Sequence, residues 1–206
     1  MALLHQATLS PSKLEILASY LVTLPAHAKT DASNFALLGS YRFDDPANEV
    51  GIEAHLLTAG SGPVIHVPLT YRAAPVAGVE EIATMEHSVL GSRWVYDACG
   101  DPVYVSQLLR AILTGGTQVE QYFETDDGRV VREPTATVIG SGSANTPIPT
   151  IDSVVTQTDG NDTVIQAGGF EIVVRHLLTE PTPAATQTLA GRWDGTEVPI
   201  SLAFVR

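Results

Sequence analysis

The sequence predicts an α+β protein, in which a curved antiparallel β-sheet carries two or three helices packed on one face and is followed by a β-rich meander. Two apolar stripes at helical spacing lie near residues 11–23 and 102–114. Between and after them, apolar and polar residues alternate with a period of two, and clusters of Gly, Pro, Asn and Asp separate these runs. A chain of 206 residues, of which 44% are apolar, is long enough to bury a substantial core.

The first predicted helix follows a short apolar segment at the N-terminus. Ser10 is expected to cap this helix and Pro11 to occupy its first position, because both residue types favour those places. Pro25 ends the pattern. The apolar side chains that recur at helical spacing are Leu14, Leu17, Ala18 and Leu21.

Three strand-like runs come next, ALLGSYRFDD, EVGIEAHLLTAG and PVIHVPLTYR, and they predict an antiparallel meander. In the second run the apolar side chains share one face, so we expect that face to be core and the other to be wet or covered by a partner. His55 and His66 are about equally distant from the turn at Gly60, which makes them a possible cross-strand pair on half-exposed positions.

The second predicted helix begins at Asp101 and Pro102, as N-cap and first residue, and ends at Gly115-Gly116. We place a seam there, between an α+β region at 1–116 and a β-rich region at 117–206. In the second region, Asp126-Asp127-Gly128 and Asp159-Gly160-Asn161 predict two hairpins. The pattern leaves open whether the two regions share one sheet.

Charge and composition exclude several classes of function. The net charge is −12, from 23 acidic and 11 basic residues, and Lys13 and Lys29 are the only lysines. Nucleic-acid or anionic-membrane binding is not expected, because both need a basic face. The single cysteine, Cys99, has no partner for an internal disulfide. The N-terminus lacks the pattern of a signal peptide and no apolar run approaches membrane-spanning length, so we expect a cytoplasmic protein.

No residue set forms a convincing catalytic site. The phosphate-loop spacing and the G-x-S-x-G elbow are absent, and the six histidines do not form a metal-binding motif. We therefore expect no cofactor and no metal. The residues that stand out mix arginine, aromatic and acidic side chains, as ligand- or partner-binding faces do. These candidates are Arg42, Tyr71, Arg72, Glu86, His87, Arg93, Trp94 and Asp97. The alternative is that they form internal salt bridges.

Three segments carry a resemblance to a known family: VPLTYR at 67–72, MEHSVLGSRWVYDACGDP at 85–102, and the helix VYVSQLLRAILTGG that follows. They resemble the N-terminal cap domain of actinobacterial maltokinases and related sugar kinases over roughly residues 1–116. Family caps carry a G-x-x-x-x-DA-x-x-D turn, which is here formed by Gly91, Asp97, Ala98 and Asp101. The segment YRFDDP at 41–46 also occurs in small actinobacterial cap-like proteins that stand alone, without a kinase. The sequence resembles these stand-alone proteins along its whole length.

The resemblance does not imply kinase activity. A kinase of this class needs a lysine on a strand and a catalytic-loop Asp followed by an Asn. Lys13 and Lys29 lie on a predicted helix and in a polar loop, and no H-x-D-x-x-x-x-N pattern occurs. The resemblance therefore implies a cap without its kinase.

Three functions are open at this point. The first is a non-catalytic module linked to trehalose, maltose or glycogen metabolism, which binds a saccharide-related ligand or a protein partner such as a sugar kinase or a glycogen-pathway enzyme. The second is a small enzyme that acts on a sugar or acyl substrate through Glu86, His87 and Asp97. The third is a structural homodimer built through an exposed sheet edge.

Overall fold

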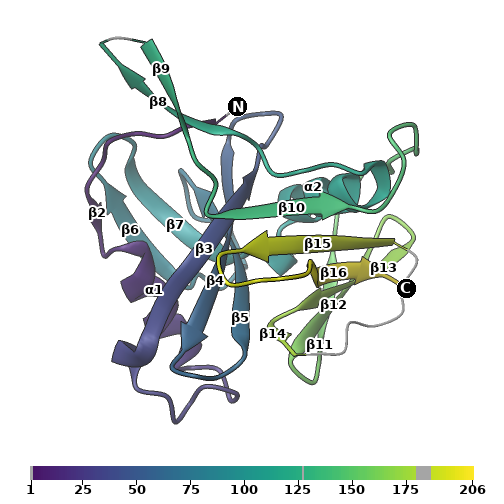
Figure 1. Cartoon of the computed structure of the whole chain (residues 1–206), viewed down its shortest axis with the longest axis horizontal. Coiled ribbons are helices and arrows are strands. Elements are labelled where there is room, and N and C mark those ends of the chain that lie inside the picture. The colour runs from purple at the N-terminus through teal and green to yellow at the C-terminus, as the bar shows by residue number, and fades with distance from the viewer. Residues whose placement is uncertain (1, 127, 180–186) are drawn as a thin grey trace.

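The computed structural model describes residues 2–126, 128–179 and 187–206. Strands of three β-sheets make up most of the regular secondary structure, and two α-helices pack against them (Figure 1). Two short 3₁₀ helices, η1 (Ala32–Asn34) and η2 (Ala98–Gly100), complete the described elements. Within the described part of the chain, no helix has the length and apolar character needed to span a membrane. The β-rich part of the predicted fold class is thus confirmed.

The largest sheet has seven strands in the order β2-β6-β7-β5-β4-β3, with β14 also paired to β5. Every pairing in it is antiparallel, and the predicted meander of three strands is confirmed as β3, β4 and β5. The strands are β2 (Leu9–Ser10), β3 (Phe35–Phe43), β4 (Val50–Ala59), β5 (Val64–Arg72), β6 (Ala83–His87), β7 (Gly91–Asp97) and β14 (Leu177–Leu178).

The second sheet has six antiparallel strands in the order β10-β15-β16-β13-β12-β11. Its strands are β10 (Ala136–Gly140), β11 (Val155–Asp159), β12 (Asp162–Ala167), β13 (Phe170–Arg175), β15 (Gln187–Trp193) and β16 (Ile200–Val205). The predicted hairpin at 159–161 is confirmed, because β11 and β12 pair around it.

A three-stranded sheet projects from the body of the molecule (Figure 1). Its central strand is β8 (Gln121–Thr125), which pairs in parallel with β1 (Ala2–Leu3) and antiparallel with β9 (Gly128–Arg132). The β8–β9 pairing confirms the hairpin predicted at 126–128, of which residue 127 lies outside the described residues.

Helix α1 (Lys13–Leu21) starts two residues later than the sequence predicts. Ser12, not Ser10, is the N-cap, because its side chain accepts a hydrogen bond from the Glu15 amide while the Glu15 carboxylate accepts one from the Ser12 amide. This reciprocal arrangement satisfies two free amide groups at once, so it outweighs the simpler Ser-Pro start.

Helix α2 (Pro102–Thr114) confirms its predicted limits. The Asp101 carboxylate caps it by accepting a hydrogen bond from the Val103 amide at 3.0 Å. Gly115 ends it with φ 71°, a left-handed conformation that costs glycine little.

The two helices pack on opposite faces of the seven-stranded sheet, which corrects the prediction that both lie on one face. The buried side of α1 joins a cluster with Leu57, Ile65 and Val67. The buried side of α2 joins a larger cluster that contains Ile52 and Leu56 together with side chains of the six-stranded sheet. Since Leu56 and Leu57 are neighbours on one strand, their side chains point to opposite faces.

Both faces of β4 are consequently buried, and the prediction of one wet face is wrong. Glu53 and His55 are only 6% and 1% exposed. The alternating sequence pattern places both on the polar face of the strand, which is expected to be wet or covered by a partner. The chain's own α1 covers this face. The cross-strand pair is also wrong by one residue, because His55 lies opposite Val67 and Leu56 lies opposite His66. The two histidines therefore occupy opposite faces of the sheet.

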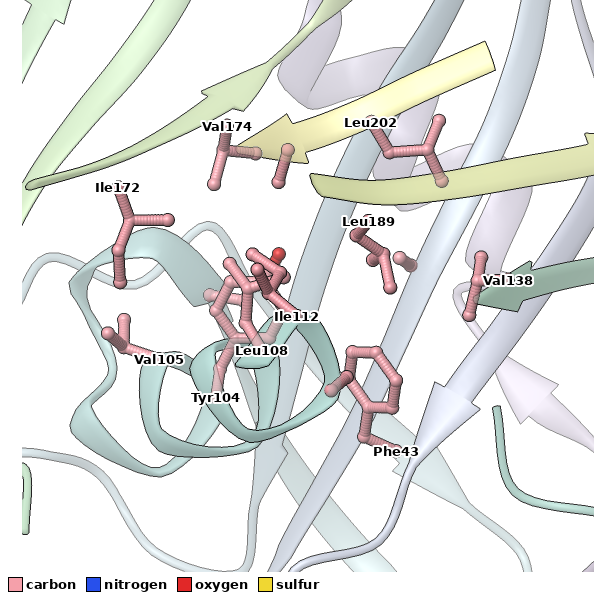
Figure 2. Packing of buried hydrophobic residues seen from close by; sticks show 14 of the residues in the cluster. Phe43, Tyr104, Val105, Leu108, Ile112, Val138, Ile172, Val174, Leu189 and Leu202 are labelled. Atoms are coloured by element: carbon pink, nitrogen blue, oxygen red, sulfur yellow. The ribbon is translucent and has the colours of Figure 1, made fainter. Parts of the chain in front are cut away.

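The larger cluster extends across the seam predicted at residue 116. It combines Tyr104 and Leu108 of α2 with Val138, Ile172 and Leu202 of the six-stranded sheet (Figure 2). The six-stranded sheet belongs to the second region alone, whereas strands of both regions share the other two sheets, through β1 paired with β8 and through β14 paired with β5.

Candidate functional site

A groove of about 1030 Å³ opens on the face of the seven-stranded sheet that also carries α1. The N-terminal segment, the loop between β3 and β4 and the start of the segment after β5 form its walls. Five of the eight candidate residues line it: Arg42, Tyr71, Arg72, His87 and Arg93. The structure thus brings most of the candidates to one surface.

An ion pair between Lys13 of α1 and Glu53 of β4 crosses the groove floor. Burial by itself raises the pKa of the Glu53 carboxyl, but the positive charges of Lys13 and Arg42, together with His55, outweigh it and hold that pKa at about 2. Glu53 is therefore ionised at neutral pH. Sequence reasoning missed this pair, since 40 residues separate its members and no local pattern connects them.

His55 lies beneath the floor, where its Nε2 and the Tyr71 hydroxyl are 3.0 Å apart. Burial lowers the pKa of His55 to about 4, so the ring is neutral at pH 7. Burial also raises the pKa of Tyr71 well above its usual value. Both groups are thus neutral, and the net charge of the floor comes from Lys13, Arg42 and Glu53.

Two guanidinium groups of the groove, those of Arg42 and Arg93, form no ion pair with any carboxylate in residues 2–126, 128–179 and 187–206. The Nε atom of Arg42 is buried and has no hydrogen-bond partner there. Arg93 donates from Nη1 to the Ser92 carbonyl oxygen at 2.9 Å. A buried donor without an acceptor costs free energy, so the burial of Arg42 Nε is a local cost to stability.

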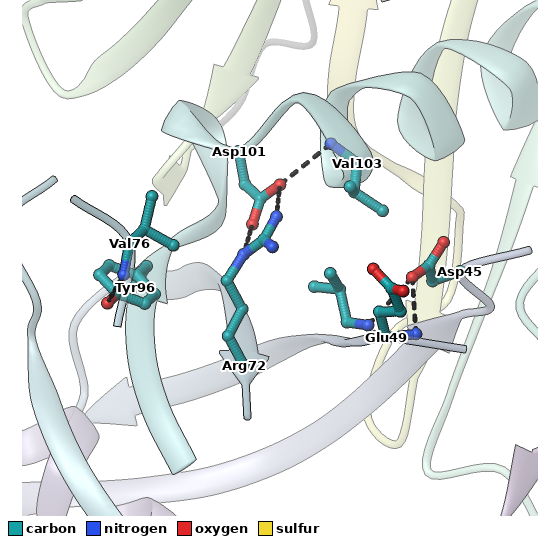
Figure 3. A network of polar contacts seen from close by, with 8 residues as sticks. Asp45, Glu49, Arg72, Val76, Tyr96, Asp101 and Val103 are labelled. Atoms are coloured by element: carbon teal, nitrogen blue, oxygen red, sulfur yellow. Dashed lines mark hydrogen bonds and ion pairs between the residues drawn. The ribbon is translucent and has the colours of Figure 1, made fainter. Parts of the chain in front are cut away.

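Arg72 has a structural partner. Its Nε and Nη2 donate to the two carboxylate oxygens of Asp101 at 2.9 and 2.8 Å, and Asp101 in turn caps α2 (Figure 3). These hydrogen bonds raise the pKa of Arg72 further above its usual value. Arg72 therefore connects the end of β5 to the start of α2, which agrees with the salt-bridge alternative for this residue.

The acidic loop between β3 and β4 is organised by Asp45 (Figure 3). Its carboxylate accepts hydrogen bonds from the amides of Ala47, Glu49 and Val50, each at 3.0 Å. Asp44, Asp45 and Glu49 are all among the residues that line the groove. This loop gives one end of the groove an acidic wall.

The remaining candidates do not converge. Glu86 and His87 are adjacent on β6, so their side chains point to opposite faces. Glu86 accepts a hydrogen bond from the Ser92 hydroxyl at 2.6 Å, and His87 Nδ1 accepts from the amides of Val89 and Leu90 at 3.2 and 3.1 Å.

Asp97 lies at the end of β7, away from the groove lining. It caps η2 by accepting from the Cys99 amide at 2.9 Å and accepts from the Tyr20 hydroxyl at 3.4 Å. Trp94 lies opposite Arg72 and Thr84 in the sheet register and does not line the groove either. The set of Glu86, His87 and Asp97 is therefore not assembled as the enzyme hypothesis requires.

No three side chains of His, Cys, Asp or Glu approach one another closely enough to hold a metal ion in the part of the chain that the structure describes. The groove offers cationic, acidic and aromatic groups instead. Such a surface can bind a polar ligand or a partner chain through charge-assisted hydrogen bonds.

Comparison with known families gives a match over the region that supplies most of the groove lining. Residues 26–101 match the family model of the maltokinase N-terminal cap domain. The match starts after α1, spans β3 to β7 and ends at the N-cap of α2. None of the curated proteins matches the chain.

Proposed function

We propose, from the premise that residues 26–101 form a maltokinase N-cap-like domain, that the chain is a non-catalytic cap-like module of the cytoplasm that acts by binding. Its role belongs to trehalose, maltose or glycogen metabolism, by analogy with the matched family. The binding surface is the groove, and the bound species is a saccharide-related ligand or a protein partner of that metabolism. The observation that carries this proposal is the pair of groove guanidinium groups, Arg42 and Arg93, which have no carboxylate partner among the described residues.

The placement of the two lysines supports binding over phosphoryl transfer. Lys13 begins α1 and pairs with Glu53, and Lys29 lies before η1, so neither occupies the strand position of a kinase lysine. The strands of the cap-like region carry the groove on one face and the main core on the other.

Affinity capture followed by mass spectrometry tests the proposal. The tagged chain is used as bait in lysate of its own source, in parallel with the variants Arg93→Ala and Arg110→Ala. Arg110 is exposed on α2 and does not line the groove, so it is the matched control. Arg72→Ala is a poor probe, because it would also remove the partner of Asp101.

We expect the wild-type chain and Arg110→Ala to recover the same kinase, synthase or other pathway protein, and Arg93→Ala to recover less of it. The proposal of a partner fails if only the bait is recovered. It also fails for this surface if Arg93→Ala captures as much as the control.

A homodimer is the second candidate, and the exposed hairpin favours it. Strand β9 is an edge strand, and all five of its residues are exposed, including Val130 and Val131 at 53% and 55%. An edge with unpaired backbone groups can add a strand from a second copy. Light scattering at high concentration tests this: a monomer mass would exclude the dimer, whereas a dimer mass that Val131→Lys reduces would support it.

A further inference from the structure

We propose that the groove binds a small anion that also carries hydroxyl groups, the class of sugar phosphates and sugar acids. The anionic group is held at the end formed by Lys13, Arg93 and His87, and the hydroxyl groups lie toward the acidic loop at Glu49. This inference names a ligand class for the proposed binding function and rests on that function.

The first step is the positive charge at one end. Burial of the ring lowers the pKa of His87, and the neighbouring His5, Arg93 and Lys13 lower it further. The rings of His5 and His87 are 5.9 Å apart. Glu53 compensates Lys13, but no described carboxylate pairs with Arg93. This end of the groove therefore keeps an uncompensated positive charge in a chain whose net charge is −12.

The chemistry of that charge selects the ligand group. A guanidinium presents a planar fork of five N–H donors, which matches phosphate and carboxylate oxygens. The one hydrogen bond of Arg93 to a carbonyl oxygen leaves most of these donors available. A neutral ligand could accept hydrogen bonds from them but would not balance the positive charge, so its bonds would be the weaker, neutral kind.

The second step is the acidic loop at the other end. Strands β6 and β7, which carry His87 and Arg93, lie two to four places from β3 and β4 in the sheet order, so the loop between β3 and β4 is on the far side of the groove. Its carboxylates would repel a bare anion. Hydroxyl groups, in contrast, donate to carboxylates, so a molecule with both kinds of group fits both ends.

The floor between the two ends has room. Gly51 and Tyr71 are opposite each other in the register, and Gly51 contributes no side chain. A groove of about 1030 Å³ is at the upper end of the usual range for small-molecule sites, which is roughly 300–1,000 Å³. Arg42 also lines the groove and adds positive charge to its floor.

Isothermal titration calorimetry on the full chain at low salt tests the inference. Four probes separate the contribution of the anionic group from that of the hydroxyl groups: glucose 6-phosphate, gluconate, glucose and inorganic phosphate. We expect glucose 6-phosphate or gluconate to bind at least about tenfold more tightly than glucose and inorganic phosphate, because each of the latter lacks one of the two groups. Binding by only one of the two anionic sugars identifies phosphate or carboxylate as the preferred group.

Variants test which end of the groove binds which group of the ligand. Arg93→Ala should lower the affinity for the tighter-binding anionic sugar by about tenfold or more, as expected for the loss of a charge-assisted pair. Arg110→Ala should leave that affinity unchanged. Glu49→Gln should lower the affinity for the same sugar but not the affinity for inorganic phosphate. Gly51→Leu should block the floor, since an added side chain meets Tyr71 at ordinary contact distances and needs no left-handed backbone. Circular dichroism verifies that each variant is folded.

The inference is overturned if none of the probes binds, if inorganic phosphate binds as tightly as glucose 6-phosphate, or if Arg93→Ala binds like the control. Partner capture that depends on Arg93, without binding of either anionic sugar, would overturn the ligand class alone and leave the proposed binding function standing.

Discussion

Acidification from pH 7 to pH 5 should destabilise this protein through His55 and His66. Both rings are buried, and burial lowers the pKa of His55 to about 4 and that of His66 to about 3. His66 Nδ1 donates to the Arg175 carbonyl oxygen at 2.9 Å, so its Nε2 is the acceptor for the Tyr41 hydroxyl at 3.0 Å. A proton on Nε2 would remove that acceptor.

The size of the effect follows from the difference between the folded and unfolded states. In the unfolded chain a histidine takes up its proton near pH 6.5, whereas these two remain neutral in the folded chain down to about pH 4 and 3. The unfolded state therefore binds more protons, and stability is full above pH 6.5 and falls below it. At about 1.36 kcal/mol per pH unit, each ring lowers the free energy of unfolding by about 2 kcal/mol at pH 5, and the two together by about 4 kcal/mol.

Urea denaturation at pH 7, 6 and 5 measures this loss. His66→Gln removes one titrating ring, so its free energy of unfolding should decline by about 2 kcal/mol less over the same range, whatever its stability at pH 7. Glu53 does not contribute in this window, because its lowered pKa affects stability only below about pH 4.5. Equal pH slopes for the wild type and His66→Gln, or no slope at all, would refute the reasoning.

Three further changes test how the structure is held together, each by chemical denaturation. Asp101→Ala removes the cap of α2 and leaves Arg72 without its carboxylate, so we expect a loss of about 1–3 kcal/mol, and Asp101→Asn should lose less because it still caps. Gly140→Ala should cost at least about 1–3 kcal/mol, since its methyl group would overlap a carbonyl oxygen of α2, whereas Gly62→Ala meets only ordinary contact and should be nearly neutral. Leu108→Ala should cost about 2–5 kcal/mol, because this fully buried side chain lies in the larger core cluster. A smaller loss at Leu108 than at an exposed leucine such as Leu37 would contradict the assignment of the core.

Local sequence patterns were sufficient to predict the elements whose limits are set by neighbouring residues. Asp101 and Pro102 mark the start of α2, Gly115 marks its end, and both hairpins follow from their turn residues. The start of α1 was misjudged by two residues, since a capping box at Ser12 competes with the Ser-Pro start at residue 10. Both signals are local, and only their relative free energies decide between them.

The groove could be predicted only in part. Arg42, Tyr71, Arg72, His87 and Arg93 stood out by residue type and do line it. Residue type could not show that Arg72 pairs with the Asp101 carboxylate while Arg93 pairs with no carboxylate of the described residues, because that depends on which strands and loops become neighbours.

The sequence by itself determined the β-rich character, the meander, the position of α2 and the resemblance of the first region to a maltokinase cap, which the match at residues 26–101 supports. The tertiary structure decided that α1 and α2 cover opposite faces of the sheet, and hence that Glu53 and His55 are buried and Lys13 reaches the groove floor. The physical reason is that a strand pattern reports which side chains share a face, whereas the element that covers each face is determined by packing among distant segments.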